Sequence, residues 1–216
     1  MKKFYLIAFF FLFKTLSVDA QFVQQGTKLV GTGAGFVGAM LQGWSVAISG
    51  DGNTMIVGGI HDFNTVFNCG AVWVYIKQGN NWVQQGNKLI PNDNIGGAYF
   101  GASVSLSYDG STAIIGGDND NAGNGAAWIF TRKNNIWSQK QKLTMLDPTG
   151  NQQHFGVSVS ITADGKAAVI GATNDNSHYG AACIFMESNG VWIQQGPKLI
   201  PINNNYSNPY FGISVS

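Results

Sequence analysis

The chain has 216 residues, of which 44% are hydrophobic and only 11% are charged, and its formal net charge is +1. A hydrophobic content this high can fill a core and excludes an intrinsically disordered chain. The near-neutral charge argues against binding to nucleic acid or to an anionic membrane, because both need clustered Lys and Arg.

The first twenty residues have the pattern of a secretory signal peptide. Two lysines precede an apolar run over residues 4–13, and small residues allow cleavage after Ala20. Lys14 interrupts the apolar run, which is therefore too short to cross a bilayer. We expect residues 1–20 to be removed, which leaves nine basic and ten acidic side chains on a secreted or cell-surface protein with no membrane insertion. An uncleaved anchor is the alternative.

Beyond this segment one pattern occurs three times and begins a fourth time. Each copy has an opening glycine, an Asp-Gly turn, an apolar run ending in Gly-Gly or Gly-Ala, a Gly-Ala stretch and a Trp stretch. The opening glycines are 58, 55 and 56 residues apart, which indicates one supersecondary unit copied along the chain. The copies are predicted at about 42–99, 100–154 and 155–210, with a partial copy at 211–216.

Each copy contains four apolar stretches separated by turn residues. In the second copy they are residues 103–107, 112–115, 125–131 and 137–143, and the first of them alternates small and large side chains as a strand does. The fourth stretch is more polar, as at 82–90 and 192–200, and suits an outer edge. No sustained helical period follows residue 20, so the chain is predicted to be all-β.

The first three strands of each copy carry almost no charge on either face. Small residues at alternate positions would let another sheet pack closely, as in a β-propeller of four-stranded antiparallel blades. Residues 22–30 match the fourth strand, and we expect them to form an N-terminal outer strand that closes the ring. Residues 211–216 begin a further blade. The expected fold is thus an incomplete propeller of about three blades, and we expect the chain to be part of a longer protein.

The openings of the copies carry a family resemblance. The motif Phe-Gly-x-Ser-Val stands at 100–104, 155–159 and 211–215, while the first copy has Gln42-Gly43 in its place. Over 22–216 the chain resembles FG-GAP repeat proteins of the short bacterial type with Ser-x-Asp-Gly turns, and distantly the propeller of integrin α-subunits. The resemblance implies a β-propeller.

Integrin-type repeats often hold calcium in an Asp-x-Asp/Asn-x-Asp-Gly loop, so the resemblance raises the question of a metal. Calcium takes roughly six to eight oxygen ligands. The corresponding turns here contain one carboxylate each, at Asp51, Asp109 and Asp164. We expect these residues to close their turns and predict no metal or cofactor, with calcium at an incomplete motif as the alternative.

A second acidic residue recurs after the second strand of each copy. These residues are Asp62, Asp120 and Asp175, and Asp118 lies beside Asp120. The expected role is an Asx turn, in which the side chain orders its own loop by bonding to the backbone. The alternative is a weak cation or sugar-hydroxyl site on one face of the propeller, centred on Asp118 and Asp120.

The repeated aromatic residues and the two cysteines are expected to be structural. A glycine doublet with spaced aromatic residues, such as Tyr75 and Trp82, also fits kelch repeats, which are the alternative architecture. The Phe-Gly-x-Ser-Val opening favours the first resemblance, and the aromatic side chains should pack between blades. Cys69 and Cys183 lie two copies apart at non-equivalent positions, so we expect buried thiols and no disulfide.

The expected function is non-enzymatic binding or adhesion, with an extracellular protein or glycan as ligand. Loops on a rigid frame commonly carry binding, and the connecting loops differ between copies. The longest insertion, residues 60–69, contains Phe63 and Phe67. The candidate ligand-binding residues are therefore Asp62, Asp118, Asp120, Asp175, Phe63 and Phe67.

An enzyme site is not expected within these residues. Hydrolytic chemistry needs paired carboxylates or a nucleophile beside a base. His61, His154 and His178 occupy three different loop positions, and Glu187 is the only glutamate. Two alternatives stay open: the propeller part of a secreted polysaccharide-active enzyme whose catalytic residues lie elsewhere, or a structural matrix component.

Overall fold

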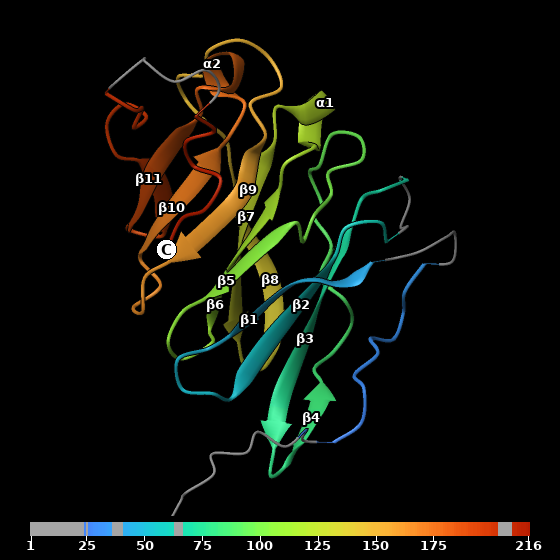
Figure 1. The fold of residues 1–216 in the computed structure, drawn as a ribbon. Helices are drawn as coiled ribbons and strands as arrows, with labels where there is room; N and C mark the ends of the chain where they lie inside the picture. The colour runs from blue at the N-terminus through green and yellow to red at the C-terminus, as the bar shows by residue number, and fades with distance from the viewer. Residues whose placement is uncertain (1–23, 25, 36–40, 63–66, 203–208) are drawn as a thin grey trace, which may run out of the picture.

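The computed structural model describes residues 24, 26–35, 41–62, 67–202 and 209–216. The expected signal peptide and Phe63 lie outside the described residues. Three four-stranded antiparallel sheets, here called blades 1 to 3, follow one another along the chain (Figure 1). Blade 1 contains β1 (Gln42–Ile48), β2 (Thr54–Gly59), β3 (Ala71–Gln78) and β4 (Asn81–Gln84). Blade 2 contains β5 (Ser103–Leu106), β6 (Thr112–Gly117), β7 (Ala126–Lys133) and β8 (Ile136–Leu143). Blade 3 contains β9 (Phe155–Ile161), β10 (Ala167–Ala172), β11 (Ala181–Ser188) and β12 (Val191–Gln194).

The predicted all-β class and the four-stranded antiparallel blades are confirmed. Within each blade the strands follow chain order, and the first strands β1, β5 and β9 lie next to one another. The only described helices are single turns, α1 (Asp120–Gly123) and α2 (Asp175–His178), which lie at one end of blades 2 and 3 (Figure 1). No helix in the described ranges is long and apolar enough to span a membrane. The three blades form an open arc, which agrees with an incomplete propeller.

The core lies between the blades. One cluster joins Ile56, Val72 and Val74 of blade 1 to Trp128 and Phe130 of blade 2. A second cluster joins blades 2 and 3 in the same way. Repeated aromatic side chains therefore pack between blades, as predicted, and face-to-face burial of apolar surface holds the arc together.

The Phe-Gly-x-Ser-Val segments lock each blade to the next. The hydroxyl of Ser103 at the start of β5 donates to the carbonyl of Gly156 at 2.8 Å. Gly156 has φ 92°, a left-handed conformation that favours glycine. Gly116 on β6 has to lack a side chain as well, since a Cβ there would lie 2.0 Å from the same carbonyl oxygen. We call this arrangement the inter-blade latch. It recurs between Ser45 and Gly101, and between Ser158 and Gly212.

The Phe side chain of the motif packs in the core between two blades, next to the inter-blade latch. Phe100 is fully buried, and its ring lies 5.4 Å from that of Trp128 in an edge-to-face arrangement. Gly70 forms a parallel bridge with Phe100, and a Cβ on Gly70 would collide with the Phe100 backbone. The same bridge joins Gly125 to Phe155. The recurrent Phe-Gly and Gly-Ala elements are thus two sides of one contact between blades.

One strand prediction needs correction, and another stays a prediction. Residues 26–30, the described end of the expected closing strand, form no strand with the three described blades. We expect them to pair with the last blade of a closed ring, and the three blades form an open arc, so this closing role stays a prediction. The predicted strands 82–90 and 192–200 end at Gln84 and Gln194, because Gly86 and Gly196 turn the chain with φ 68°. Blade 2 has no glycine at the position equivalent to Gly86 and Gly196, so β8 continues to Leu143.

The two ends of the arc expose apolar residues that are covered inside it. Val46 and Ile48 of β1 are 55% and 56% exposed, whereas Leu106 and Ile161, the equivalents of Ile48, are each 8% exposed. At the other end, Phe211 bridges Gly180, so the partial copy begins a fourth blade in the expected register. The contact surface of each repeat is therefore complete only where another repeat follows or precedes it.

Both cysteines are buried free thiols, and they lie in different parts of the arc. Burial raises the pKa of Cys183 to about 12 and also raises that of Cys69. These thiols pack as small apolar groups.

Candidate functional site

The Ser-x-Asp-Gly turns use their carboxylates to close themselves. In blade 2 the Ser107 hydroxyl donates to Asp109 Oδ1 at 2.7 Å and accepts the backbone N–H of Thr112 at 3.0 Å. The pKa of Asp109 lies below its usual value, chiefly because of the Ser107 hydroxyl bond. Asp51 and Asp164 close their turns in the same way, and their pKa values are lowered by the equivalent hydroxyl bonds. The geometry is that of a turn cap.

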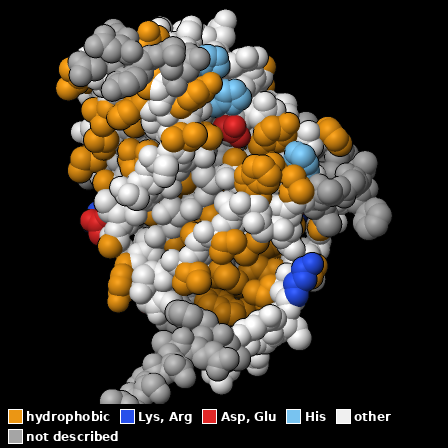
Figure 2. All heavy atoms as spheres, viewed as in Figure 1, with side chains coloured by type: hydrophobic (Ala, Val, Ile, Leu, Met, Phe, Trp, Pro, Cys, Tyr) orange, Lys and Arg blue, Asp and Glu red, His pale blue; other side chains and the backbone are white. Residues whose placement is uncertain are grey.

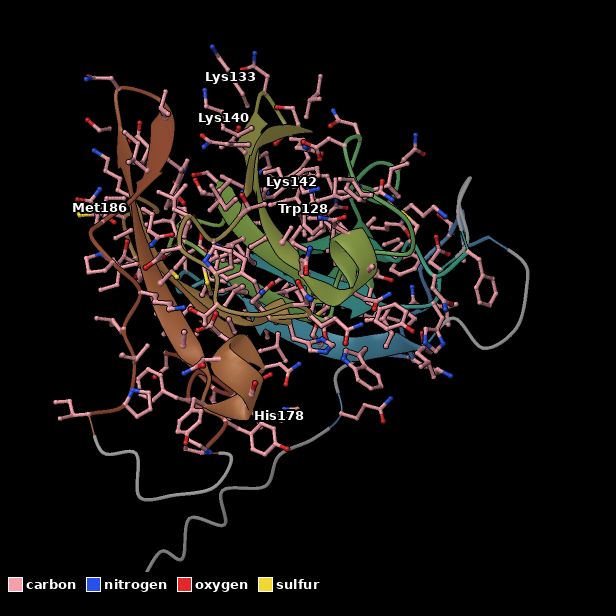
Figure 3. The ribbon with its side chains drawn as sticks, turned by 90° about the horizontal axis from the view of Figure 1, so that it is seen from above. Trp128, Lys133, Lys140, Lys142, His178 and Met186 are labelled. Atoms are coloured by element: carbon pink, nitrogen blue, oxygen red, sulfur yellow. The ribbon has the colours of Figure 1, made fainter. Side chains whose placement is uncertain are left out.

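The recurrent aspartates after the second strands are buried ion-pair partners. Asp120 is almost fully buried, and its Oδ2 lies 2.7 Å from Lys142 Nζ on β8. Its other oxygen accepts the backbone N–H of Ile95 at 2.7 Å. Lys142 also donates to the carbonyl of Asp93 and lies over the Trp128 ring. Figure 3 shows Lys142 and Trp128 close to each other. The pair therefore ties together a loop, an outer strand and the connection between blades 1 and 2.

The same construction occurs in each blade. Asp62 pairs with Lys88 and Asp175 with Lys198, and their second oxygens accept the backbone N–H groups of Gly35 and Thr149. The side-chain-to-backbone bond predicted for these aspartates exists, but its donor lies 25–27 residues away. The expectation of a local Asx turn needs this correction. The loop itself turns through residues with a left-handed backbone conformation, such as Asn121 and Ala122 in α1.

A cation site at these aspartates finds no support in the geometry. Each carboxylate already faces a lysine ammonium, which leaves no net negative charge to attract a metal. In the part of the chain that the structure describes, no three His, Cys, Asp or Glu side chains converge in a metal-binding group. The charged groups of the Asp120–Lys142 and Asp175–Lys198 pairs nevertheless line hollows at the surface.

A larger hollow lies where the first strands of the three blades meet. We call it the axial hollow; its volume is about 350 Å³. Trp44, Ala102 and Val157, which occupy equivalent positions after the opening glycine of each copy, all line it. Convergence of equivalent residues from three blades places this hollow at the propeller axis. Its wall also includes Leu41, Ile60, His61, Tyr99 and Asp118.

Three side-chain pairs contain all three histidines of the chain, and two of these pairs contribute His61, Tyr99 and Asp118 to the wall of the axial hollow. Figure 2 shows histidine, acidic and hydrophobic side chains close together on one face of the molecule. His154 Nδ1 lies 3.3 Å from Asp118 Oδ2. This hydrogen bond raises the pKa of His154, against a smaller lowering by burial. His61 packs on Tyr99 and His178 on Tyr210, with ring centroids 5.6 and 5.4 Å apart.

One backbone position organises these pairs. Leu41, Tyr99, His154 and Tyr210 each precede the opening Gly by two residues, and all have φ between 49° and 56°. Bulky residues rarely adopt this left-handed conformation. The turn after each of them is closed by a backbone bond, such as that from the N–H of Ala102 to the carbonyl of Tyr99 at 3.0 Å. The backbone is constant and the side chain changes from copy to copy.

Among the predicted site residues, only Asp118 lines the axial hollow. Asp62, Asp120 and Asp175 lie in the buried pairs, Phe67 is 61% exposed on its loop, and Phe63 lies outside the described residues. Trp44, Tyr99 and His154 were missed. For Tyr99 and His154, the signal that could have found them is the difference between copies two positions before the opening glycine. For Trp44 it is the difference one position after that glycine, where the other copies have Ala102 and Val157.

Two segments of the chain match a known repeat family. The family model described as FG-GAP repeat matches residues 82–130 and 137–185. These are two successive units of the same period, each running from the Trp strand of one blade to the third strand of the next. The chain contains FG-GAP repeats. No curated protein matches this FG-GAP chain.

One solved structure supports the propeller-like fold. The FG-GAP chain is similar to a putative 6-phosphogluconolactonase from Bacteroides uniformis, with a TM-score of 0.50 and 15% identity over 72% of this chain. It spans 39% of the length of that protein. A hydrazine synthase from Kuenenia stuttgartiensis aligns with a TM-score of 0.44 and 12% identity, over 80% of this chain and 38% of the other. At these identities the likeness concerns the fold alone.

Proposed function

We propose that this FG-GAP repeat protein is an exported, non-enzymatic scaffold that binds an extracellular protein or glycan through the face around the axial hollow. One observation carries the proposal. Two positions before each opening glycine, the backbone is left-handed in all four copies, but the residue is Leu41, Tyr99, His154 or Tyr210. Leu41 and Tyr99 line the axial hollow. A constant frame that presents different side chains around one hollow suits a binding surface.

The chemistry of the axial hollow suits recognition. Trp44 is 57% exposed, and together with Tyr99 and His61 it offers aromatic and apolar contact. Asp118 offers an acceptor whose position is held by His154. FG-GAP repeats are typical of extracellular proteins, which agrees with the signal-like residues 1–20 and supports the proposed export.

Binding can be tested with two ligand libraries, a glycan array and a random-peptide display library. Both are screened with the secreted chain and with the variants Trp44→Ala and Tyr99→Gly. Glycine accepts the left-handed backbone of Tyr99, so this variant removes the ring without adding strain. Tyr108→Ala is the matched control, because Tyr108 is an equally exposed aromatic residue, 58% against 57% for Trp44, outside the axial hollow.

The expected result is a set of ligands whose binding is lost in the two hollow variants and kept in the control. An absence of ligands in both libraries would contradict the proposed function. Ligands that bind all three variants as well as the wild type would place binding on another surface. Export is tested separately, by mass spectrometry of the N-terminus in the medium, where cleavage after Ala20 is expected.

A further inference from the structure

Two smaller hollows recur beside the buried Asp–Lys pairs. The blade-2 hollow has a volume of about 250 Å³, and the blade-3 hollow about 110 Å³. Four positions that carry the same residue line both, because Asp120, Asn121, Gly125 and Lys142 of the first correspond to Asp175, Asn176, Gly180 and Lys198 of the second. The repeat therefore builds the same polar recess twice.

The walls of the blade-2 hollow offer both hydrogen-bond donors and acceptors without a net charge. Asp120 and Lys142 neutralise each other at 2.7 Å. The lysine ammonium has three N–H groups, and its polar partners within the described residues are Asp120 and the Asp93 carbonyl. Asn121 and Thr144 add an amide and a hydroxyl, and both are exposed.

Apolar groups complete the recess. Met145 and Pro148 line the blade-2 hollow, and Tyr179 lines its blade-3 equivalent. A wall that combines an apolar face with neutral polar groups matches a sugar ring, which has an apolar face and a rim of hydroxyls. A metal ion or a free anion would instead need an uncompensated charge. The volume lies below the roughly 300–1,000 Å³ of drug-sized pockets, so the recess takes one ring and not an oligomer.

We propose that the hollows beside the Asp–Lys pairs of blades 2 and 3 each bind one neutral sugar unit of a glycan. The ring lies against the apolar wall, its hydroxyls accept from Lys142 and Asn121, and they donate to carbonyl and amide oxygens. Each site is weak by itself. Because the two sites are built on one rigid arc, a branched or repeating glycan gains affinity by occupying both.

This inference names a ligand class and a site that the proposed function leaves open, and it rests on that function only in expecting an extracellular glycan. Its residues differ from those of the axial hollow. A loss of sugar binding in variants of the hollows beside the Asp–Lys pairs and a loss of library ligands in Trp44→Ala are thus independent results.

The test is a titration of the secreted chain with neutral hexoses and N-acetylhexosamines up to about 100 mM, a range that reaches millimolar dissociation constants. Heat is measured by calorimetry, and the indole N–H signal of Trp128 is followed by NMR. That ring lies 5.3 Å from Lys142 Nζ and reports on the blade-2 hollow. Saturable heat and a shift of the Trp128 signal are expected for at least one sugar.

Matched asparagine variants locate the binding. Asn121 and Asn176 both have φ 51°, so replacing each by glycine removes the amide without strain. Asn121→Gly should weaken the Trp128 response about fivefold, the effect of one lost hydrogen bond, and the double variant with Asn176→Gly should weaken the heat similarly. Asn134→Gly makes the same change at φ 51° in the distant β7–β8 turn and should have no effect.

Three outcomes would overturn the proposal. The first is no heat and no Trp128 shift with any neutral sugar. The second is a Trp128 shift that Asn121→Gly leaves unchanged. The third is a stronger response to inorganic phosphate than to every neutral sugar, since that would make Lys142 an anion site.

Discussion

The inter-blade latch can be tested by adding one methyl group. In Gly116→Ala, the new Cβ would lie 2.0 Å from the carbonyl oxygen of Gly156 and 2.3 Å from Ser103 Oγ. Contacts shorter than 3.0 Å are not tolerated, and the first involves backbone that cannot rotate away. Blades 2 and 3 would have to separate locally, which also breaks the 2.8 Å bond between Ser103 and Gly156.

The expected magnitude follows from two costs. Overpacking a well-packed interface costs about 1–3 kcal/mol, and a clash with fixed backbone belongs near the upper end. The lost hydrogen bond adds about 1 kcal/mol. We therefore expect Gly116→Ala to lower the free energy of unfolding by about 3–4 kcal/mol, which is a large part of the stability of a typical domain.

The assay is urea denaturation followed by tryptophan fluorescence, with the free energy of unfolding compared at unchanged slope. Gly86→Ala is the control. Gly86 has φ 68° and open space around it, so its substitution carries only the cost of a left-handed alanine, about 1 kcal/mol. Equal destabilisation by the two variants would refute the latch, because it would show that contact between blades 2 and 3 is no tighter than an open turn.

Further predictions concern three buried or paired groups. Lys142→Met leaves Asp120 buried without its partner and should lower the unfolding free energy by about 3–5 kcal/mol in urea, with partial recovery when Asp120→Asn is added. Because the bond to Asp118 raises the pKa of His154, this pair stabilises the fold fully below the ordinary histidine pKa, and the effect disappears as pH rises through the raised value. The loss caused by His154→Asn, about 0.5 kcal/mol for so exposed a pair, should therefore be measurable at pH near 5.5 and absent near pH 8.5. Burial raises the pKa of the Cys183 thiol to about 12, so it should react slowly with a disulfide reagent in the folded chain and promptly in guanidinium; fast reaction in the folded state would show that blade 3 opens.

The repeat and its strands could be predicted because their signals are local. Alternation over 103–107, the turn at Asp109-Gly110 and the constant spacing of the opening glycines each depend on residues close in sequence. The same locality explains the error at the outer strands. Residues 82–90 and 192–200 each read as one strand, but which part of each pairs with its neighbour depends on the assembled sheet, and the strands end at Gln84 and Gln194.

The sequence by itself determined the all-β class, the four-stranded repeat and the resemblance to FG-GAP proteins, since each is written in short motifs that recur. Only the tertiary structure decided what the acidic residues do. Asp120 reads as a loop residue until the fold brings Lys142 and Ile95 to it from distant segments. The axial hollow likewise exists only where three blades converge, so Trp44 and Val157, more than a hundred residues apart, become neighbours in one site.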